Sequence, residues 1–200
     1  MAPTMVKFGS LPLKRTVFFL CDLQEKFRTA VLYFEQVVQS ASKLLQASKM
    51  LDVPLIVTEQ YPQGLGRTVA ELDITHAKGV YSKTKFSMIT PEVAIQLDCL
   101  CEGNVQCAVL FGLETHICVE QTAAELCAHG IQVHVVADAC TSRSQEDRLL
   151  ALQRLQQIGC FITTTESVLF KLLGDKEHPR FKDIHSLVTK PTPPTGLAKM

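Results

Sequence analysis

Short apolar runs, separated by longer amphipathic stretches, recur along the whole chain. The runs are rich in Val, Ile, Leu and Phe and do not alternate with polar residues, which is typical of strands buried on both faces of a parallel sheet. The stretches between them place apolar residues at helical spacing. We therefore expect strands and helices to alternate. The predicted strands cover residues 16–22, 53–59, 79–83, 106–112, 132–138 and 160–164.

Three helices are clearest between these strands. Residues 34–51 and residues 117–129 each carry one apolar face at helical spacing. Ser144 and Asp147 have the spacing of a capping box ahead of the helical pattern at 148–158. Because helices that connect parallel strands cover the faces of the sheet, the predicted fold class is α/β, a three-layer α/β/α sandwich on a parallel sheet.

Composition and charge narrow the class of protein. The chain has 200 residues, enough for one domain with a substantial core. Its 20 basic and 20 acidic residues give a formal net charge of zero, so there is no electrostatic footprint for nucleic acid or an anionic membrane. No apolar run approaches the roughly 20 residues that a membrane span requires. We expect a soluble protein that binds neither nucleic acid nor membranes.

The cysteines and the two ends of the chain bear on its compartment. The N-terminal sequence does not have the pattern of a signal peptide, so we expect the eight cysteines to be reduced thiols in an intracellular compartment. None of them forms a C-x-x-C pair, which argues against a zinc knuckle or a thioredoxin motif. The last three residues, Ala198-Lys199-Met200, resemble a variant of the Ser-Lys-Leu peroxisomal address. Residues 1–17 are basic and resemble a weak mitochondrial presequence. We expect a cytoplasmic protein, with the peroxisome as the second and the mitochondrion as the third location.

Three polar residues follow separate predicted strands. Asp22, Lys83 and Cys118 each lie where a strand ends, and ligands of open parallel sheets bind beyond the carboxyl ends of the strands. Each residue also has a structural interpretation: Asp22 as a turn former, Lys83 as a solvated side chain and Cys118 as a packing residue. Their convergence at one edge of the sheet favours a catalytic site.

The chemistry of this set is that of a cysteine nucleophile. A helix N-terminus and the Lys83 ammonium both favour the thiolate of Cys118. Asp22 can accept the thiol proton and later return it to a leaving group. The backbone N–H of Cys118, with one from the turn before it, can hold a carbonyl oxyanion. A nucleophile, a base and an electrostatic stabiliser are thus predicted without a histidine.

Three motifs that contain these residues also resemble a known family. "FLCDLQEKF", "KTKFSM" and "GLETHICVEQTAAEL" are similar to the signatures of the isochorismatase-like cysteine hydrolases, and "VTEQYPQGLG" and "DACTSRSQEDR" are similar to the eukaryotic isochorismatase domain-containing proteins. The resemblance implies a six-stranded, Rossmann-like parallel sheet and an Asp22–Lys83–Cys118 triad. It also implies a hydrolase domain over residues 14–187, which leaves 188–200 as a flexible, proline-rich tail.

The family further implies a cis peptide bond between Leu113 and Glu114, with the backbone amides of Glu114 and Cys118 forming the oxyanion hole. Lys85 competes with Lys83 for the lysine of the triad, but Lys83 fits the family spacing K-x-x-F-S better. Nicotinamidases of this family bind a metal through an Asp and two His after the second strand. Residues 57–66 contain no His, so we expect no metal and no cofactor.

The leading hypothesis is a cysteine hydrolase that cleaves a C–N bond of a small amide or related acyl substrate through a thioester. The alternative is a catalytically silent binding or scaffold protein that keeps the hydrolase fold. A neutral, 46% hydrophobic chain of this family is expected to form a homo-oligomer, a dimer or tetramer. Arg67 is a candidate for contact with a substrate carboxylate. The predicted substrate-pocket residues are Gln24, Phe27, Glu59, Tyr61 and Phe86.

Overall fold

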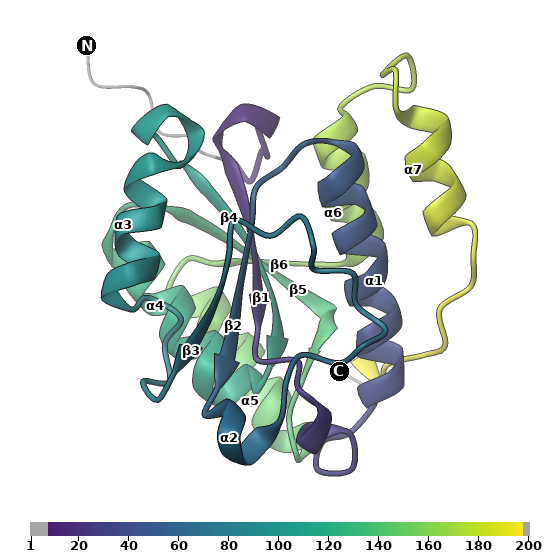
Figure 1. Ribbon diagram of the computed structural model, residues 1–200. Helices are drawn as coiled ribbons and strands as arrows, with labels where there is room; N and C mark the ends of the chain where they lie inside the picture. Colours follow the sequence, from purple (N-terminus) through teal and green to yellow (C-terminus); the bar gives the residue numbers. More distant parts are fainter. Residues whose placement is uncertain (1–7, 198–200) are drawn as a thin grey trace.

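Six parallel strands form one sheet in the order β3-β2-β1-β4-β5-β6 (Figure 1). The computed structural model describes residues 8–197. Every predicted strand is confirmed, and the largest difference is in β5, which extends three residues further, to Thr141. The strands are β1 (Thr16–Cys21), β2 (Leu55–Gln60), β3 (Gly79–Lys83), β4 (Cys107–Leu113), β5 (Gln132–Thr141) and β6 (Phe161–Thr163).

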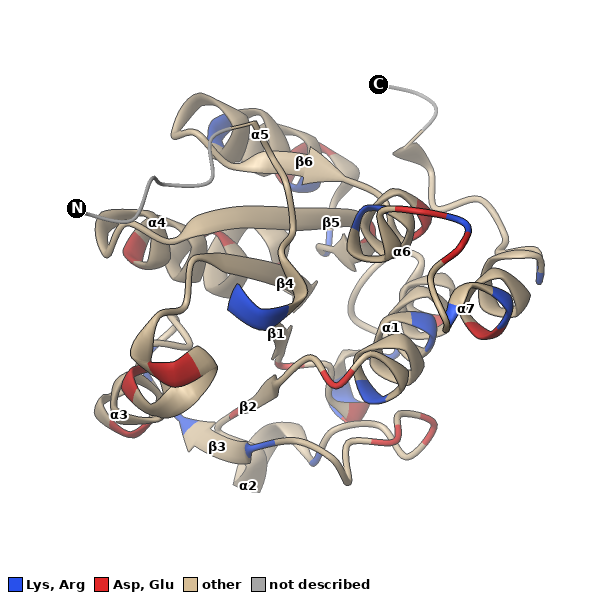
Figure 2. Ribbon diagram, turned by 90° about the horizontal axis from the view of Figure 1, so that it is seen from above, with Lys and Arg blue, Asp and Glu red and all other residues tan. Residues whose placement is uncertain are grey.

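Helices cover both faces of this sheet, as Figure 2 shows in a view from above, with α1, α6 and α7 on one side and α3, α4 and α5 on the other. The predicted three-layer α/β/α sandwich is therefore confirmed. Acidic and basic residues are interspersed over the helices, in keeping with the zero net charge. The helices are α1 (Phe34–Met50), α2 (Pro62–Leu65), α3 (Pro91–Cys99), α4 (Glu120–Ala128), α5 (Gln145–Gln157), α6 (Thr165–Leu173) and α7 (Phe181–Val188).

Local sequence explains where several of these elements begin. Of the predicted capping box at α5, the N-cap bond is present: Ser144 Oγ accepts a hydrogen bond from the Asp147 N–H at 3.0 Å. The Asp147 carboxylate accepts a hydrogen bond from the Ser144 hydroxyl at 2.7 Å, in place of the Ser144 N–H of a full capping box. The predicted helix 117–129 begins later as an α-helix, at Glu120, because a π-helical turn, Thr115–Val119, precedes it. Among the described residues, no helix is both long and apolar enough to cross a membrane.

The centre of the core lies between β1 and β4, whose residues are all buried. Phe18 and Phe111 meet there edge to face, with ring centroids 6.1 Å apart. Gly112 pairs with Cys21 in the register of these strands and has φ +128°, a conformation that favours glycine. A Cβ at Gly112 would collide with the carbonyl oxygen of Cys21. Glycine at this position thus lets the end of β4 lie against the end of β1.

The C-terminal segment, which the sequence predicts to be flexible, makes contacts with the domain. Residues 190–197 form no α-helix or strand, as the prolines predict. Lys43 Nζ on α1 donates to the Lys190 carbonyl at 2.6 Å, and Arg148 Nη1 on α5 donates to the Thr195 carbonyl at 2.5 Å. Side chains of the domain thus satisfy carbonyls of the segment. The suggested peroxisomal address (198–200) and residues 1–7 lie outside the described residues.

Candidate active site

The order of the strands predicts a crevice at one point of the sheet. β1 is followed along the chain by β2 on one side, whereas β4, β5 and β6 extend the sheet on the other side. In open parallel sheets ligands bind at such a switch point, beyond the carboxyl ends of the strands. Asp22 follows the last residue of β1, and the turn with Cys118 follows β4. Lys83 is the last residue of β3.

Asp22 and Lys83 form a buried ion pair. Lys83 Nζ lies 2.6 Å from Asp22 Oδ2, and the two side chains are 0% and 1% exposed. The second carboxylate oxygen, Asp22 Oδ1, accepts a hydrogen bond from Thr58 Oγ1 at 2.7 Å. Lys83 Nζ also donates to Gln60 Oε1 at 2.6 Å and to the Phe86 carbonyl at 2.8 Å. Hydrogen bonds thus fix both members of the pair in position.

The surroundings keep Lys83 charged. Burial alone would favour the neutral amine, but the interactions of the ammonium with the acidic groups around it, among them its ion pair and hydrogen bond with the Asp22 carboxylate, outweigh burial and raise the pKa of Lys83 above its usual value. Lys83 is therefore a cation at neutral pH. Lys85, the competing lysine, binds Glu125 instead, with Nζ–Oε1 at 2.6 Å, and its side chain is about half exposed. This geometry favours Lys83 as the lysine of the site.

Cys118 lies in the π-helical turn, Thr115–Val119, between β4 and α4. Its side chain is buried, with 7% of the residue exposed. The peptide bond between Leu113 and Glu114 is cis, as the family resemblance implies. The carbonyl of Glu114 then accepts hydrogen bonds from the N–H groups of Ile117 at 3.1 Å and Val119 at 3.2 Å. The turn is thereby tied to the end of β4, at the edge of the crevice.

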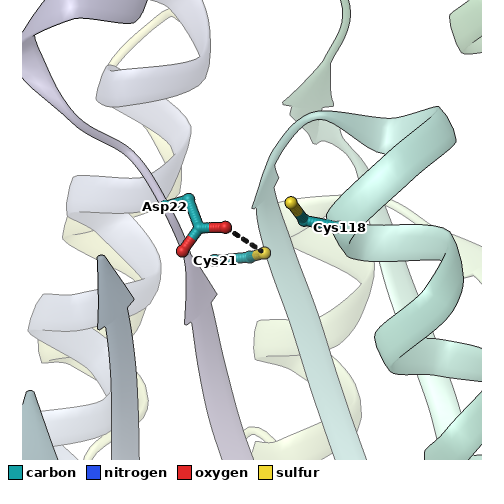
Figure 3. Close-up of side chains that lie close together, drawn as sticks. All are labelled: Cys21, Asp22 and Cys118. Atoms are coloured by element: carbon teal, nitrogen blue, oxygen red, sulfur yellow. Dashed lines mark hydrogen bonds between the residues drawn. The ribbon is translucent and has the colours of Figure 1, made fainter. Parts of the chain in front are cut away.

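A second thiol, Cys21, lies at the same place and was missed as a site residue by the sequence analysis. Figure 3 shows Cys21 and Asp22 at the end of β1, facing Cys118 on the turn after β4. Cys21 Sγ donates to Asp22 Oδ2 at 3.6 Å, and one atom each of Cys21, Asp22 and Cys118 lie within 4.8 Å of one another. Burial, the contact with Cys118 and the charge of Asp22 raise the pKa of Cys21 well above its usual value. Cys21 is thus a neutral thiol.

Comparisons with known proteins agree with this geometry. The model of the isochorismatase domain matches residues 16–167, most of the chain. The chain belongs to the isochorismatase family. It is 48% identical to isochorismatase domain-containing protein 2 of Xenopus laevis, over 97% of this chain and 93% of that protein. It is 49% identical to isochorismatase domain-containing protein 1 of Salmo salar, over 94% of this chain, and spans 66% of the length of that relative.

Solved structures show the same isochorismatase-like fold. The structure of the MAR1 ribonuclease from Caenorhabditis elegans has a TM-score of 0.89 and 40% identity, and it covers 94% of this chain and 97% of its own. Two YcaC proteins are more distant. The protein from Pseudomonas aeruginosa, solved with covalent acrylamide, has a TM-score of 0.81 at 19% identity over 90% of this chain and 92% of its own. The Escherichia coli protein, an octameric hydrolase of unknown specificity, has a TM-score of 0.78 at 20% identity, over 92% of this chain and 96% of its own.

Two of the predicted pocket residues have a different role in this isochorismatase domain. Gln24 is fully buried; its Nε2 donates to the carbonyls of Gln60 at 2.9 Å and Gly66 at 2.7 Å, and its Oε1 accepts from the Gln60 N–H at 2.7 Å. Glu59 accepts hydrogen bonds at 2.8 Å from Arg67 Nη1 and the Thr68 N–H. We therefore correct their assignment: both side chains hold the loop beside the site, and Arg67 is paired with Glu59.

The bonds to Glu59 also set its charge. Burial alone would raise the pKa of its carboxyl, but the hydrogen bonds from Thr68 and Arg67 outweigh burial and lower it below the usual value.

The three aromatic pocket candidates differ in exposure. Phe27 packs against the core, whereas Tyr61 and Phe86 are 55% and 50% exposed. Tyr61 and Lys83 line a surface hollow of about 240 Å³, so aromatic surface is available beside the site.

Few side chains at this site are available to bind a metal ion. Cys21, Asp22 and Cys118 present three donor atoms close together, the one such group of His, Cys, Asp and Glu side chains within residues 8–197. The Lys83 ammonium already occupies Asp22 Oδ2 and would repel a metal cation there. The segment 57–66, where nicotinamidases carry their metal ligands, has no histidine. The side chains therefore fit a cysteine site better than a metal site.

Proposed function

We propose that the chain is a metal-independent cysteine hydrolase that cleaves the C–N bond of a small amide or related acyl compound through a thioester. The proposal rests on one observation above all: a buried Lys83–Asp22 pair lies at the same switch point as Cys118. A lysine cation and a carboxylate beside a thiol provide charge stabilisation and a proton acceptor for a thiolate nucleophile. Membership of the isochorismatase family and the hydrolase fold agree with it.

In the proposed reaction Cys118 Sγ attacks the substrate carbonyl carbon and its proton passes to Asp22. The carbonyl oxygen becomes an oxyanion that the backbone N–H groups of Glu114 and Cys118 stabilise. Collapse of this intermediate breaks the C–N bond, and Asp22 returns the proton to the leaving amine. Water, deprotonated by Asp22, then hydrolyses the thioester and restores the Cys118 thiol. Lys83 stays charged throughout and limits the repulsion between Asp22 and the thiolate.

Neighbouring proteins bear on this proposal in two ways. Acrylamide is an electrophile, and the covalent acrylamide in YcaC from Pseudomonas aeruginosa is in keeping with a nucleophile on this fold. The name of the Caenorhabditis elegans relative instead suggests ribonuclease activity as an alternative function. In this chain the Lys83 cation is excluded from solvent and paired with Asp22, so it is a poor phosphate ligand, and the net charge is zero. These features favour a small neutral acyl substrate.

The test is a comparison of wild type with Cys118→Ala on a panel of small amides and on single-stranded RNA. We expect amine release by wild type and a loss of at least about 1,000-fold in Cys118→Ala, since the thioester cannot form. Denaturing mass spectrometry of the quenched wild-type reaction should show the mass of the acyl group on the peptide with Cys118. Equal turnover by both proteins contradicts the proposal, and turnover of RNA alone favours the nuclease.

We further propose that the chain forms a homo-oligomer. The Escherichia coli YcaC protein is described as octameric, so association occurs on this fold. A chain without net charge has little long-range repulsion to oppose it. Sedimentation velocity at micromolar concentration should show a dimer or a larger closed assembly. Monomer alone at that concentration contradicts this proposal.

A further inference from the structure

The candidate site holds a thiol that the hydrolytic cycle does not use. Cys21 is fully buried, donates a hydrogen bond to Asp22, and lies with its sulfur within 4.8 Å of Cys118 Sγ (Figure 3). We propose that Cys21 resolves oxidised Cys118: a hydroperoxide oxidises Cys118, and a Cys21–Cys118 disulfide then forms that blocks the nucleophile reversibly. This inference rests on the proposed function, because it requires Cys118 to be the reactive thiol of the site.

The backbone holds the two cysteines near each other. Cys21 ends β1 and pairs with Gly112 of β4, where the lack of a Cβ permits close approach. A disulfide needs its sulfurs about 2.05 Å apart. The sulfurs must therefore approach by under about 3 Å, roughly the displacement of Sγ when one cysteine changes from one staggered rotamer to the next. A change of rotamer is therefore a movement of the required size.

Each step of the proposed oxidation balances. The Cys118 thiolate attacks one oxygen of the hydroperoxide ROOH; an S–O bond forms, the O–O bond breaks, and ROH leaves after taking up a proton. Cys118 is now a sulfenic acid. Cys21 Sγ attacks its sulfur while the Cys21 proton passes to Asp22 Oδ2, its hydrogen-bond partner. The S–S bond forms, the S–O bond breaks, and hydroxide takes that proton and leaves as water.

The hydroperoxide is reduced by two electrons in this sequence, and the two thiols supply them. Two equivalents of a small thiol restore Cys21 and Cys118 by exchange through a mixed disulfide. Without Cys21, the sulfenic acid would instead persist or react with more peroxide to the sulfinic acid, which thiols do not reduce. The second thiol therefore converts an irreversible loss of the nucleophile into a reversible one.

Another close pair of cysteines provides an internal comparison. Cys127 Sγ and Cys160 Sγ lie 3.7 Å apart, away from the triad, on α4 and just before β6. Cys127 is partly exposed, and its hydrogen bond with Cys160 lowers its pKa to about 7. The short distance between the sulfurs and the thiolate character of Cys127, taken alone, therefore favour disulfide formation at Cys127–Cys160 over Cys21–Cys118. Oxidation at Cys21–Cys118 in preference to it would show that the site directs the reaction.

The test treats wild type, Cys21→Ser, Cys21→Ala and Cys127→Ser with a small excess of hydrogen peroxide and maps the products by mass spectrometry. Cleavage after Arg15, Glu25, Glu114 and Glu120 isolates Cys21 in residues 16–25 and Cys118 in residues 115–120, each as the single cysteine of its peptide. Parallel samples are labelled with iodoacetamide before and after dithiothreitol, and a dimedone probe traps sulfenic acid.

In wild type and Cys127→Ser we expect the two peptides to be joined with the loss of two hydrogens. Labelling of Cys118 should fall roughly tenfold and return after dithiothreitol. In either Cys21 variant, Cys118 should be trapped by dimedone and recover poorly. If Cys118 is labelled rapidly in the untreated protein but never joins Cys21, this inference fails while the proposed nucleophile stands. If only a Cys127–Cys160 disulfide forms, the inference fails. If Cys118 reacts with neither hydrogen peroxide nor iodoacetamide, both the inference and the assignment of Cys118 as the nucleophile fail.

Discussion

Lys83 Nζ lies 2.6 Å from Asp22 Oδ2, and neither side chain is accessible to solvent. Removal of one partner would leave a charge buried without its counter-ion, which costs about 3–5 kcal/mol. Lys83→Met should therefore lower the free energy of unfolding by about that amount. Asp22→Asn/Lys83→Met should lose less than the sum of the two single variants, because no uncompensated charge remains. Chemical denaturation of the four proteins measures this coupling.

Lys85→Met is the matched control for the buried pair. Lys85 also binds a carboxylate at 2.6 Å, that of Glu125, but both side chains are more than one-third exposed. Exposed ion pairs contribute about 0–1 kcal/mol, so Lys85→Met should be nearly neutral. Equal destabilisation by Lys83→Met and Lys85→Met would mean that burial of the Asp22–Lys83 pair does not set its energy.

Cys118 should react fastest of the eight cysteines with limiting iodoacetamide at neutral pH. We expect this because Cys118 lies beside the Lys83–Asp22 pair at the start of the helical segment, whereas burial raises the pKa of Cys140 to about 12 and that of Cys107 to about 11. Peptide mapping over a time course gives the order of labelling. Lys83→Met should slow labelling of Cys118 and leave that of the exposed Cys99 unchanged. Faster modification of Cys99, Cys101 or the partly exposed Cys127 in wild type contradicts the assignment.

Arg148 should hold the C-terminal segment on the domain. Its side chain is fully buried; Nη1 donates to the Thr195 carbonyl and Nη2 donates to the Ala137 carbonyl at 2.8 Å. Arg148→Met leaves both carbonyls without this donor, so we expect a loss of about 1–3 kcal/mol. Hydrogen exchange around Thr195 should become faster. Lys49→Met, which removes an ion pair with Asp73 in which both side chains are more than half exposed, should change neither quantity.

His134 should make stability fall in mild acid. The ring is fully buried and stacks on Phe161 with centroids 5.0 Å apart; burial, with a smaller contribution from Lys171, lowers its pKa to about 4. The unfolded chain takes up this proton near pH 6.5, whereas the folded protein does so only near pH 4, so stability is lost as the pH falls between these values. At pH 4.5 the linkage costs roughly 2 kcal/mol.

His134→Gln removes this titration. Denaturation at pH 7.5 and pH 4.5 should show a loss of stability that is smaller in the variant by roughly 2 kcal/mol. His129→Gln serves as the control, since this exposed histidine follows the end of α4. A parallel loss in wild type and His134→Gln would assign the acid sensitivity to other groups.

The fold could be predicted from the sequence wherever a pattern of residues is compatible with only one kind of structure. Continuous apolar runs have few stable places other than a sheet buried on both faces, so all six strands could be predicted, and with them the position of Asp22, Lys83 and Cys118 at one edge. Polar side chains with several possible partners were less predictable. Gln24 and Glu59 were expected to face substrate, but their partners are backbone groups and an arginine of the neighbouring loop.

Two further features depended on contacts that no local pattern encodes. Cys21 looked like an ordinary strand residue, since successive side chains of a strand point to opposite faces. Asp22, however, leaves the strand with φ +48°, and its carboxylate lies within hydrogen-bonding distance of the Cys21 thiol. The prolines after Lys190 correctly excluded a helix but said nothing of Arg148, 47 residues before Thr195, which binds that segment.

The hydrogen bonds of Gln24 also bear on how proteins with this fold acquire new binding specificities. The hydrogen bonds of its side-chain amide are to main-chain atoms at the end of β2 and in the loop after it: the N–H and carbonyl of Gln60 and the carbonyl of Gly66. The side chains at Tyr61, Gln63 and Leu65 are therefore free to mutate without disturbing this support. Selection can thus alter what the rim of the crevice accepts while the path of the loop stays constant, so new specificities can arise by substitution alone.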